Sequence, residues 1–189
     1  MKVLSSIIAV VFLSSLSLAA QVDEHDVVPK EYSLELGYRY ISASKFENQA
    51  SMGTTILLDY AWQLSGFNRK NASYISVPLG YTMLRPDTEN DSKMSILSYG
   101  WTVRHELGRE KKVIPFFGYS LLFNQLRQAD FDGSIFGHQT KFDLGINLNN
   151  SGKVRYFTKF EYSYTRYPRW GHDKSYTMHT WELKVGARF

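Results

Sequence analysis

Charged side chains recur at every second position within several apolar segments of the chain, as at Glu182, Lys184 and Arg188 near its end. Alternate residues of an extended strand share one face, so we expect these side chains to gather on one side of a sheet. Six carboxylates and seven cationic groups occupy such positions: Glu35, Asp59, Glu106, Asp143, Glu161 and Glu182, with Arg39, Arg104, Lys141, Arg155, Lys159, Lys184 and Arg188. Such a balanced set predicts mutual ion pairs, and the open alternative is a proton or ion path through them.

The histidines are candidate metal ligands, and their spacing decides whether they could act together. Counting back from residues 149–153 pairs His138 with Tyr164, and a count across 167–175 pairs Tyr164 with His179. These side chains would form a row on the apolar face, spread over three strands and joined by no carboxylate. Such a row is a poor metal site, so we expect no metal and no cofactor, and interfacial polar residues instead.

A weak basic patch lies close to that row in the sequence. Arg166, Arg169 and Lys174 lie near Trp170, where an anionic lipid headgroup could be met.

The elements that must position these residues are strands. Apolar and polar residues alternate with a period of two in eight segments separated by polar turns, a pattern typical of half-buried strands. The segments lie near residues 31–42, 54–64, 73–84, 94–107, 113–126, 138–149, 153–167 and 175–189. In the last one, Trp181, Leu183 and Val185 alternate with charged residues.

Alternation also fits a soluble sandwich, and two features favour a closed membrane barrel. The polar face carries charges well inside the strands, whereas the apolar face is rich in Tyr and Trp at its ends, as in the aromatic girdles of membrane barrels. Aromatic residues make up 15 % of the chain. A closed barrel also removes every sheet edge, which a bilayer requires. We therefore predict an all-β, up-and-down barrel of eight antiparallel transmembrane strands.

The connections predict the orientation in the membrane. Tight polar turns at 108–112 and 149–153 are typical of the periplasmic side, and longer connections near 43–53, 85–93, 127–137 and 167–175 would face outward. An even number of strands places both ends of the barrel in the periplasm. The turn at 65–72 is longer than this pattern predicts.

The first twenty residues have the layout of a secretory signal peptide. Lys2 precedes an uncharged apolar stretch, and Ala19 and Ala20 offer cleavage after either residue. We expect a signal peptide at 1–20, a short periplasmic segment at 21–30 and the barrel at 31–189. The absence of cysteine excludes disulfides and thiolate metal sites, and a formal net charge of +4 is too small to suggest nucleic-acid binding.

The barrel segment resembles the small outer-membrane barrels typified by the OmpA and OmpX families. Its last strand, from Trp181 to Phe189, alternates and ends on Phe, like the C-terminal signal of that superfamily. The resemblance implies recognition by the barrel-assembly machinery and location in the bacterial outer membrane, with outer-membrane lipids including lipopolysaccharide as partners. It implies no particular activity, because this fold carries many functions.

A weaker resemblance points to an enzyme. His138-Gln139-Thr140 is similar to the His-x-Ser motif of PagL-like lipid A deacylases, which would make His138 the general base and Thr140 the nucleophile. Thr stands where that family has Ser, and no Glu falls on the neighbouring apolar face.

The first functional hypothesis is a non-enzymatic barrel with a salt-bridged lumen that serves envelope structure or surface interaction. Eight strands leave room only for side chains, so a solute porin is excluded. A lipid A acyl hydrolase is the alternative. A conduit for small apolar molecules, as in OmpW-like barrels, would require an apolar lumen, and the charged interior argues against it.

Overall fold

The computed structural model describes residues 30–44, 50–64, 70–87, 93–129, 133–148, 154–168 and 175–189. The predicted signal peptide and nearly all of the predicted periplasmic segment lie outside these residues. Within the described ranges, no helix is both long and apolar enough to cross a membrane.

The described chain consists of eight strands, as the alternation predicts. Their bounds are β1 Lys30–Ser44, β2 Met52–Leu64, β3 Asn71–Arg85, β4 Met94–Leu107, β5 Val113–Gln128, β6 Ser134–Leu148, β7 Arg155–Tyr167 and β8 Tyr176–Arg188.

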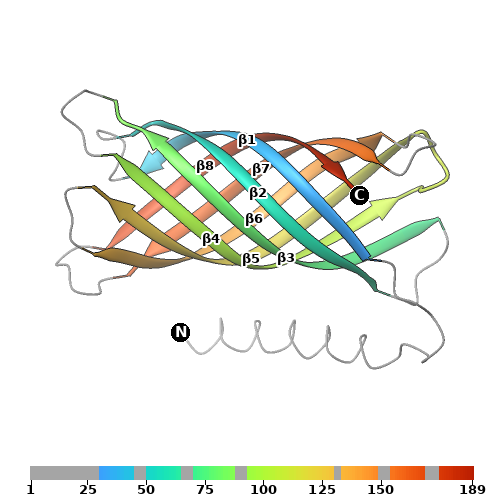
Figure 1. Ribbon diagram of the computed structural model, residues 1–189, viewed down its shortest axis with the longest axis horizontal. Helices are drawn as coiled ribbons and strands as arrows, with labels where there is room; N and C mark the ends of the chain where they lie inside the picture. The colour runs from blue at the N-terminus through green and yellow to red at the C-terminus, as the bar shows by residue number, and fades with distance from the viewer. Residues whose placement is uncertain are drawn as a thin grey trace.

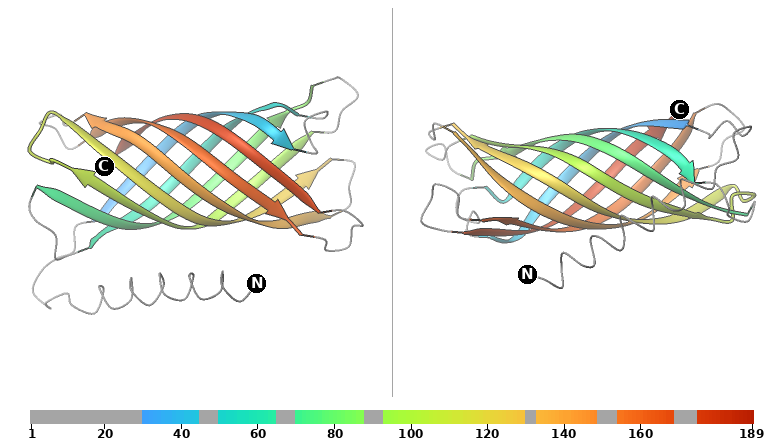
Figure 2. Two further views of the ribbon diagram at one scale, coloured as in Figure 1. Left: turned by 180° about the vertical axis from the view of Figure 1, so that it is seen from behind. Right: turned by 90° about the horizontal axis from the view of Figure 1, so that it is seen from below.

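The strands close into an antiparallel barrel in sequence order, with β8 returning to β1. The closing pair places Ser33 opposite Arg188, with one register shift between Ile41 and Ala43. Figure 1 shows the strands inclined to the long axis of the barrel, with the start of β1 and the C-terminus at one end. We call this end the terminal mouth. The opposite end, where β1–β2, β3–β4, β5–β6 and β7–β8 connect, is the loop mouth (Figure 2).

Side chains alternate between the lumen and the outside along every strand. In β1, the inward Ser33 and Glu35 are buried, whereas Tyr32, Leu34 and Leu36 are about half exposed. An outward face of Leu, Val and aromatic side chains suits hydrocarbon surroundings, where such side chains can be exposed without cost.

Outward charges within the strands occur only near strand ends. Lys30 begins β1 at the terminal mouth, and Arg85, Arg127 and Arg166 lie at the loop-mouth ends of β3, β5 and β7. No carboxylate occupies an outward strand position among the described residues. The barrel therefore presents an uncharged band with basic residues at its borders.

Candidate functional site: a layered lumen and an outward polar patch

A cluster of ion pairs fills the middle of the lumen. Glu161 is its centre: its carboxylate accepts from Lys184 Nζ at 2.7 Å, Lys159 Nζ at 2.9 Å and Lys141 Nζ at 3.1 Å. The three lysines come from β8, β7 and β6, so the cluster ties neighbouring strands together through their side chains. Each of these side chains is at least 92 % buried, where an unpaired charge would be very costly.

Two further carboxylates extend this central cluster. Glu35 pairs with Lys159 at 2.8 Å, and the guanidinium of Arg39 donates to one oxygen of Glu182 from Nε at 3.2 Å and Nη2 at 3.0 Å. Lys184 Nζ lies 3.6 Å from Glu182 and so joins the two parts. The central cluster is defined by Glu35, Arg39, Lys141, Lys159, Glu161, Glu182 and Lys184.

A separate cluster, the mouth cluster, lies at the terminal mouth. Glu31 pairs with Arg104 at 2.7 Å, with Arg188 at 3.3 Å and with Arg155. Glu106 contacts the same three guanidiniums at 3.3–3.4 Å and Arg109 at 3.7 Å. No ion pair joins the two clusters within the described part of the chain.

Aromatic rings separate the two clusters. Phe116 and Phe157 meet edge to face with centroids 6.2 Å apart, and the guanidinium of Arg188 lies 4.1 Å from the centroid of Phe157 and 4.7 Å from that of Phe116. Phe157 occupies the space that a Cβ at Gly186 would take, and Phe116 does the same at Gly145. The rings cover Arg188 and hold it by cation–π contact.

A third layer, of apolar side chains, closes the loop mouth. This loop-end cap consists of Ile41, Ala50, Leu84, Met94, Ile96, Leu126, Tyr167 and Met178, each at most 5 % exposed. Buried hydroxyl pairs lie between the cap and the central cluster, among them Thr55 with Thr82 at 2.9 Å and Ser163 with Thr180 at 2.5 Å. The lumen therefore changes from charged to hydroxylic to apolar along its length.

The structure places all thirteen predicted lumen residues at inward positions. Eleven of them form ion pairs. Asp59 and Asp143 form none with described residues, although both lie on the inner wall. Glu31, which binds three arginines, was not among the predicted lumen residues. Its position could have been predicted, because Glu31 lies two residues before Ser33 and four before Glu35 and so shares their face. Including Glu31 gives seven carboxylates facing seven bases.

The outward patch consists of His138, Thr140, Tyr162, Tyr164, Arg166 and His179 on β6, β7 and β8. Its strand pairing differs from the prediction between β6 and β7. His138 lies opposite Arg166, and Thr140 lies opposite Tyr164, so the predicted pairing of His138 with Tyr164 is wrong. The count assumed pairing centred on residue 151, whereas β6 ends at Leu148 and β7 begins at Arg155, which shifts the pairing by two residues. The predicted pairing of Tyr164 with His179 is confirmed.

Within this outward patch, His179 is held from two sides. Its Nδ1 lies 2.7 Å from the Tyr162 hydroxyl, and its ring meets Tyr164 edge to face at 5.0 Å between centroids. His138 packs edge to face on Phe123 at 5.4 Å. No group of three metal-ligating side chains is found here or elsewhere in the described ranges.

The pair His138 and Thr140 shares the outward face of β6, and both side chains are exposed. Strand neighbours two apart are separated by about 6.6 Å, and no hydrogen bond joins these two described side chains. Their cross-strand neighbours are Phe123, Leu121, Tyr164 and Arg166, so no carboxylate is placed to orient the imidazole. Trp181 and Phe189 both lie on the outward face of the closing strand or at its end, exposed at 40 % and 59 %.

A closed eight-stranded barrel with a charged lumen and an apolar, aromatic outside is an integral outer-membrane protein. The family model described as outer membrane protein beta-barrel domain matches residues 8–189, and the chain belongs to this family. The predicted fold class and the predicted location in the bacterial outer membrane are thereby confirmed.

Several solved structures of low sequence identity are similar to this chain, and the first of them shares its fold. Neisserial surface protein A has 14 % identity and TM-score 0.64, with 86 % of this chain and 98 % of that chain covered. The outer-membrane enzyme PagL has 13 % identity and TM-score 0.48, covering 82 % and 97 %. OprG from Pseudomonas aeruginosa has 10 % identity and TM-score 0.49, covering 88 % and 99 %. No curated protein sequence matches the chain.

Proposed function

We propose that this protein is a non-enzymatic outer-membrane barrel that stabilises the outer leaflet by binding lipopolysaccharide on its outward face at the loop mouth. One observation carries the proposal: every outward charge at the loop-mouth ends of the described strands is basic. Arg85, Arg127 and Arg166 lie there on alternate strands, with His138 directly opposite Arg166. Phosphate groups of the lipid are anionic, and arginine binds them with two parallel hydrogen bonds.

The filled lumen supports a role on the outer surface. Ion pairs occupy the centre and the terminal mouth, and the loop-end cap adds a packed apolar layer above them. Among the described residues, such a packed interior leaves no route for solutes to pass through the lumen. The apolar cap is the part of the lumen closest in chemistry to a conduit for apolar molecules, but its side chains fill it.

The expected membrane orientation supports lipid binding by Arg85, Arg127 and Arg166 in the outer leaflet. In small barrels of this type both ends of the chain face the periplasm, so the loop mouth faces outward. Tyr162, Tyr164 and Trp181 point outward from β7 and β8, the strand of Arg166 and its neighbour, and such amphipathic rings favour the headgroup region.

The lipopolysaccharide proposal is tested with Arg166→Gln. The barrel is purified from outer membranes in mild detergent, and the lipid A retained per barrel is measured by mass spectrometry. We expect Arg166→Gln to retain severalfold less lipid, because it removes a charge-assisted contact from an exposed position. Lys30→Gln is the matched control, since it removes an outward basic residue at the opposite end. Equal retention by all three proteins would refute the proposal.

The alternative, a lipid A acyl hydrolase, rests on the shared outward face of His138 and Thr140. Catalytic hydrogen bonds often tighten only when substrate binds, so the free geometry leaves this function open to a direct test. The test is mass spectrometry of lipid A after incubation with the refolded barrel and with its His138→Ala variant. We expect unchanged lipid A in both. Loss of an acyl chain with the unaltered barrel alone would establish the hydrolase and make Thr140 the next residue to substitute.

A further inference from the structure

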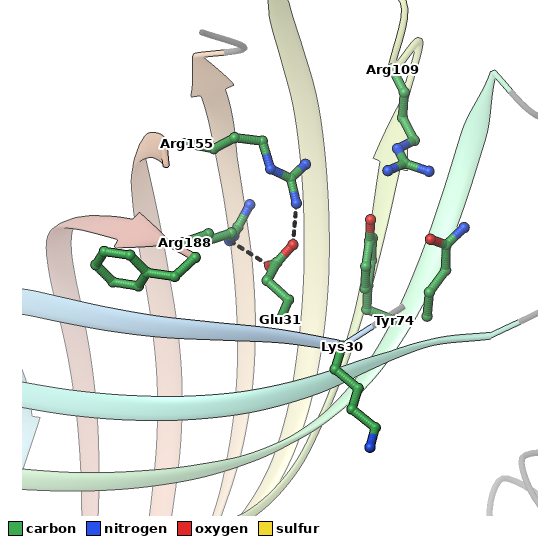
Figure 3. Close-up of a pocket in the computed structure, with 8 residues that line it drawn as sticks. Lys30, Glu31, Tyr74, Arg109, Arg155 and Arg188 are labelled. Carbon is green, nitrogen blue, oxygen red and sulfur yellow. Dashed lines mark hydrogen bonds and ion pairs between the residues drawn. The ribbon is translucent and has the colours of Figure 1, made fainter. Parts of the chain in front are cut away.

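A polar pocket of about 180 Å³ opens at the terminal mouth, at the edge of the mouth cluster. Lys30, Glu31, Gln63, Tyr74, Arg109, Arg155, Arg188 and Phe189 line it. Figure 3 shows Arg155 and Arg188 reaching Glu31 from one side, while Arg109 and the hydroxyl of Tyr74 point toward each other on the other side. Lys30 points away from this group. The pocket therefore lies between guanidiniums that come from separate elements.

The mouth cluster holds more positive than negative charge. Four guanidiniums, those of Arg104, Arg109, Arg155 and Arg188, surround the two carboxylates of Glu31 and Glu106. The side chains of Arg104 and Arg188 are only 7 % and 2 % exposed, and those of Arg155 and Arg109 are 20 % and 33 % exposed. These ion-paired groups carry two more positive than negative charges, and Asp59 offsets part of this excess at Arg104. Positive charge left over in such a setting favours a bound anion.

Among the described residues, the two ion-paired carboxylates of the mouth cluster are already engaged, and Asp59, which also acts electrostatically on Arg104, forms no ion pair there. Glu31 already pairs with three arginines and Glu106 with four. The main-chain oxygen of Phe189 accepts a hydrogen bond from the backbone of Tyr32 at 3.2 Å, in the continuation of the sheet. The central cluster lies beyond Phe116 and Phe157, which separate its carboxylates from the mouth.

The guanidiniums of this pocket are held in place before any ligand arrives. Arg188 lies against Phe116 and Phe157 and also contacts Asn147 and Glu106. Arg155 is fixed by Glu31 and Glu106, and Arg104 lies 4.2 Å above the ring of Tyr74. Fixed donors lower the entropy lost on binding, and the planar guanidinium fork matches the oxygens of a phosphate group.

We propose that this pocket binds a phosphate group, carried either by a free phosphate ion or by the headgroup of an anionic phospholipid at the rim of the barrel. Arg109 contacts it from the turn between β4 and β5, and Arg155 and Arg188 contact it from the wall. In the membrane orientation given above, the pocket faces the periplasm. This site therefore lies at the opposite end of the barrel from Arg85, Arg127 and Arg166 and is independent of the proposed binding of lipopolysaccharide.

The test compares Arg109→Gln with Lys111→Gln. Both substitutions remove one positive charge from the same turn, but Lys111 is exposed and does not line the pocket. Circular dichroism in non-ionic detergent verifies that each barrel is folded. Inorganic phosphate is then titrated into each protein by calorimetry, and native mass spectrometry measures retention of phosphatidylglycerol against phosphatidylcholine.

We expect saturable binding by the unaltered protein, weakened about tenfold by Arg109→Gln as for loss of a charged hydrogen bond, and unchanged in Lys111→Gln. Binding of inorganic phosphate identifies a free ion as a ligand, whereas selective retention of phosphatidylglycerol alone identifies the headgroup. Absence of binding in both arms overturns the proposal. Equal binding by Arg109→Gln and the unaltered protein, or equal weakening by the two substitutions, overturns it as well.

Discussion

The two ends of the lumen are filled by opposite kinds of side chain. The terminal half is held by ion pairs, with Glu161 bound to three lysines and Glu31 to three arginines. The loop half is closed by the apolar cap, in which Ile96 and Tyr167 are completely buried. The ion pairs and the apolar cap fill the same narrow barrel, but substituting a side chain destabilises them for different reasons.

The charged clusters depend on particular partner residues, whereas the apolar cap does not. A buried carboxylate is tolerated only while its cationic partners surround it, and removing it leaves several charges without compensation. An apolar side chain in the cap depends on shape and volume, and neighbouring side chains can relax partly into the space left by a truncation. Predicted effects therefore decrease from the charged half to the cap, and from the cap to the outward face.

The largest effect is expected for Glu161→Gln. Three lysines lose their shared carboxylate in the interior, so we expect the free energy of unfolding to fall by about 3–5 kcal/mol. Urea unfolding in detergent or lipid vesicles measures it, with Glu110→Gln, an exposed turn residue, as the control. Adding Lys184→Met should recover part of the loss, because it removes one of the uncompensated charges. A loss below 1 kcal/mol would contradict the assigned role of the central cluster.

In the cap, Leu126→Ala is expected to lower the free energy of unfolding by roughly 3 kcal/mol, through lost burial and a residual cavity. Leu126 is 2 % exposed. Leu121→Ala on the outward face of the same strand is the matched comparison, because that side chain is 40 % exposed and meets lipid. An equal fall in the free energy of unfolding for the two variants, measured by urea unfolding, would contradict the description of the cap as a packed layer.

At the boundary between the two charged clusters, Gly186→Ala should cost about 2 kcal/mol by overpacking. The added Cβ would overlap the ring of Phe157, which covers Arg188. The double variant Gly186→Ala with Phe157→Leu should lose less than the sum of the single losses, since the smaller side chain makes room. Additive losses in unfolding experiments would show that the ring does not depend on this glycine.

The smallest effect is expected on the outward patch. His179→Phe removes the contact between His179 Nδ1 and the Tyr162 hydroxyl, and we expect a cost of about 1 kcal/mol or less. Tyr162→Phe removes the same contact from the other side and should cost as much. A loss close to that of Glu161→Gln would mean that the patch, like the central cluster, is essential to folding.

Strand number, closure and the two faces were predictable from the sequence because a period of two is a local signal that every strand repeats. The inward positions of the lumen charges, from Glu35 to Arg188, follow from parity alone. Parity also assigns Glu31 to the inward face, although this residue stands at the very start of its segment, where the alternation begins. Register across the turn after β6 was not predictable, because the pairing depends on where each strand ends, and a shift of two residues keeps the same faces.

The sequence by itself determined that the chain forms a barrel with charges inside, since alternation along one strand needs no knowledge of any other strand. Only the tertiary structure decided which charges meet. Glu161 meets lysines of β6, β7 and β8, whereas Glu31 on β1 meets arginines of β4, β7 and β8. Strand stagger and, for Glu31, barrel closure set these contacts. The apolar cap and the excess positive charge at the terminal mouth were decided in the same way, because both depend on the level at which each inward side chain lies along the barrel axis.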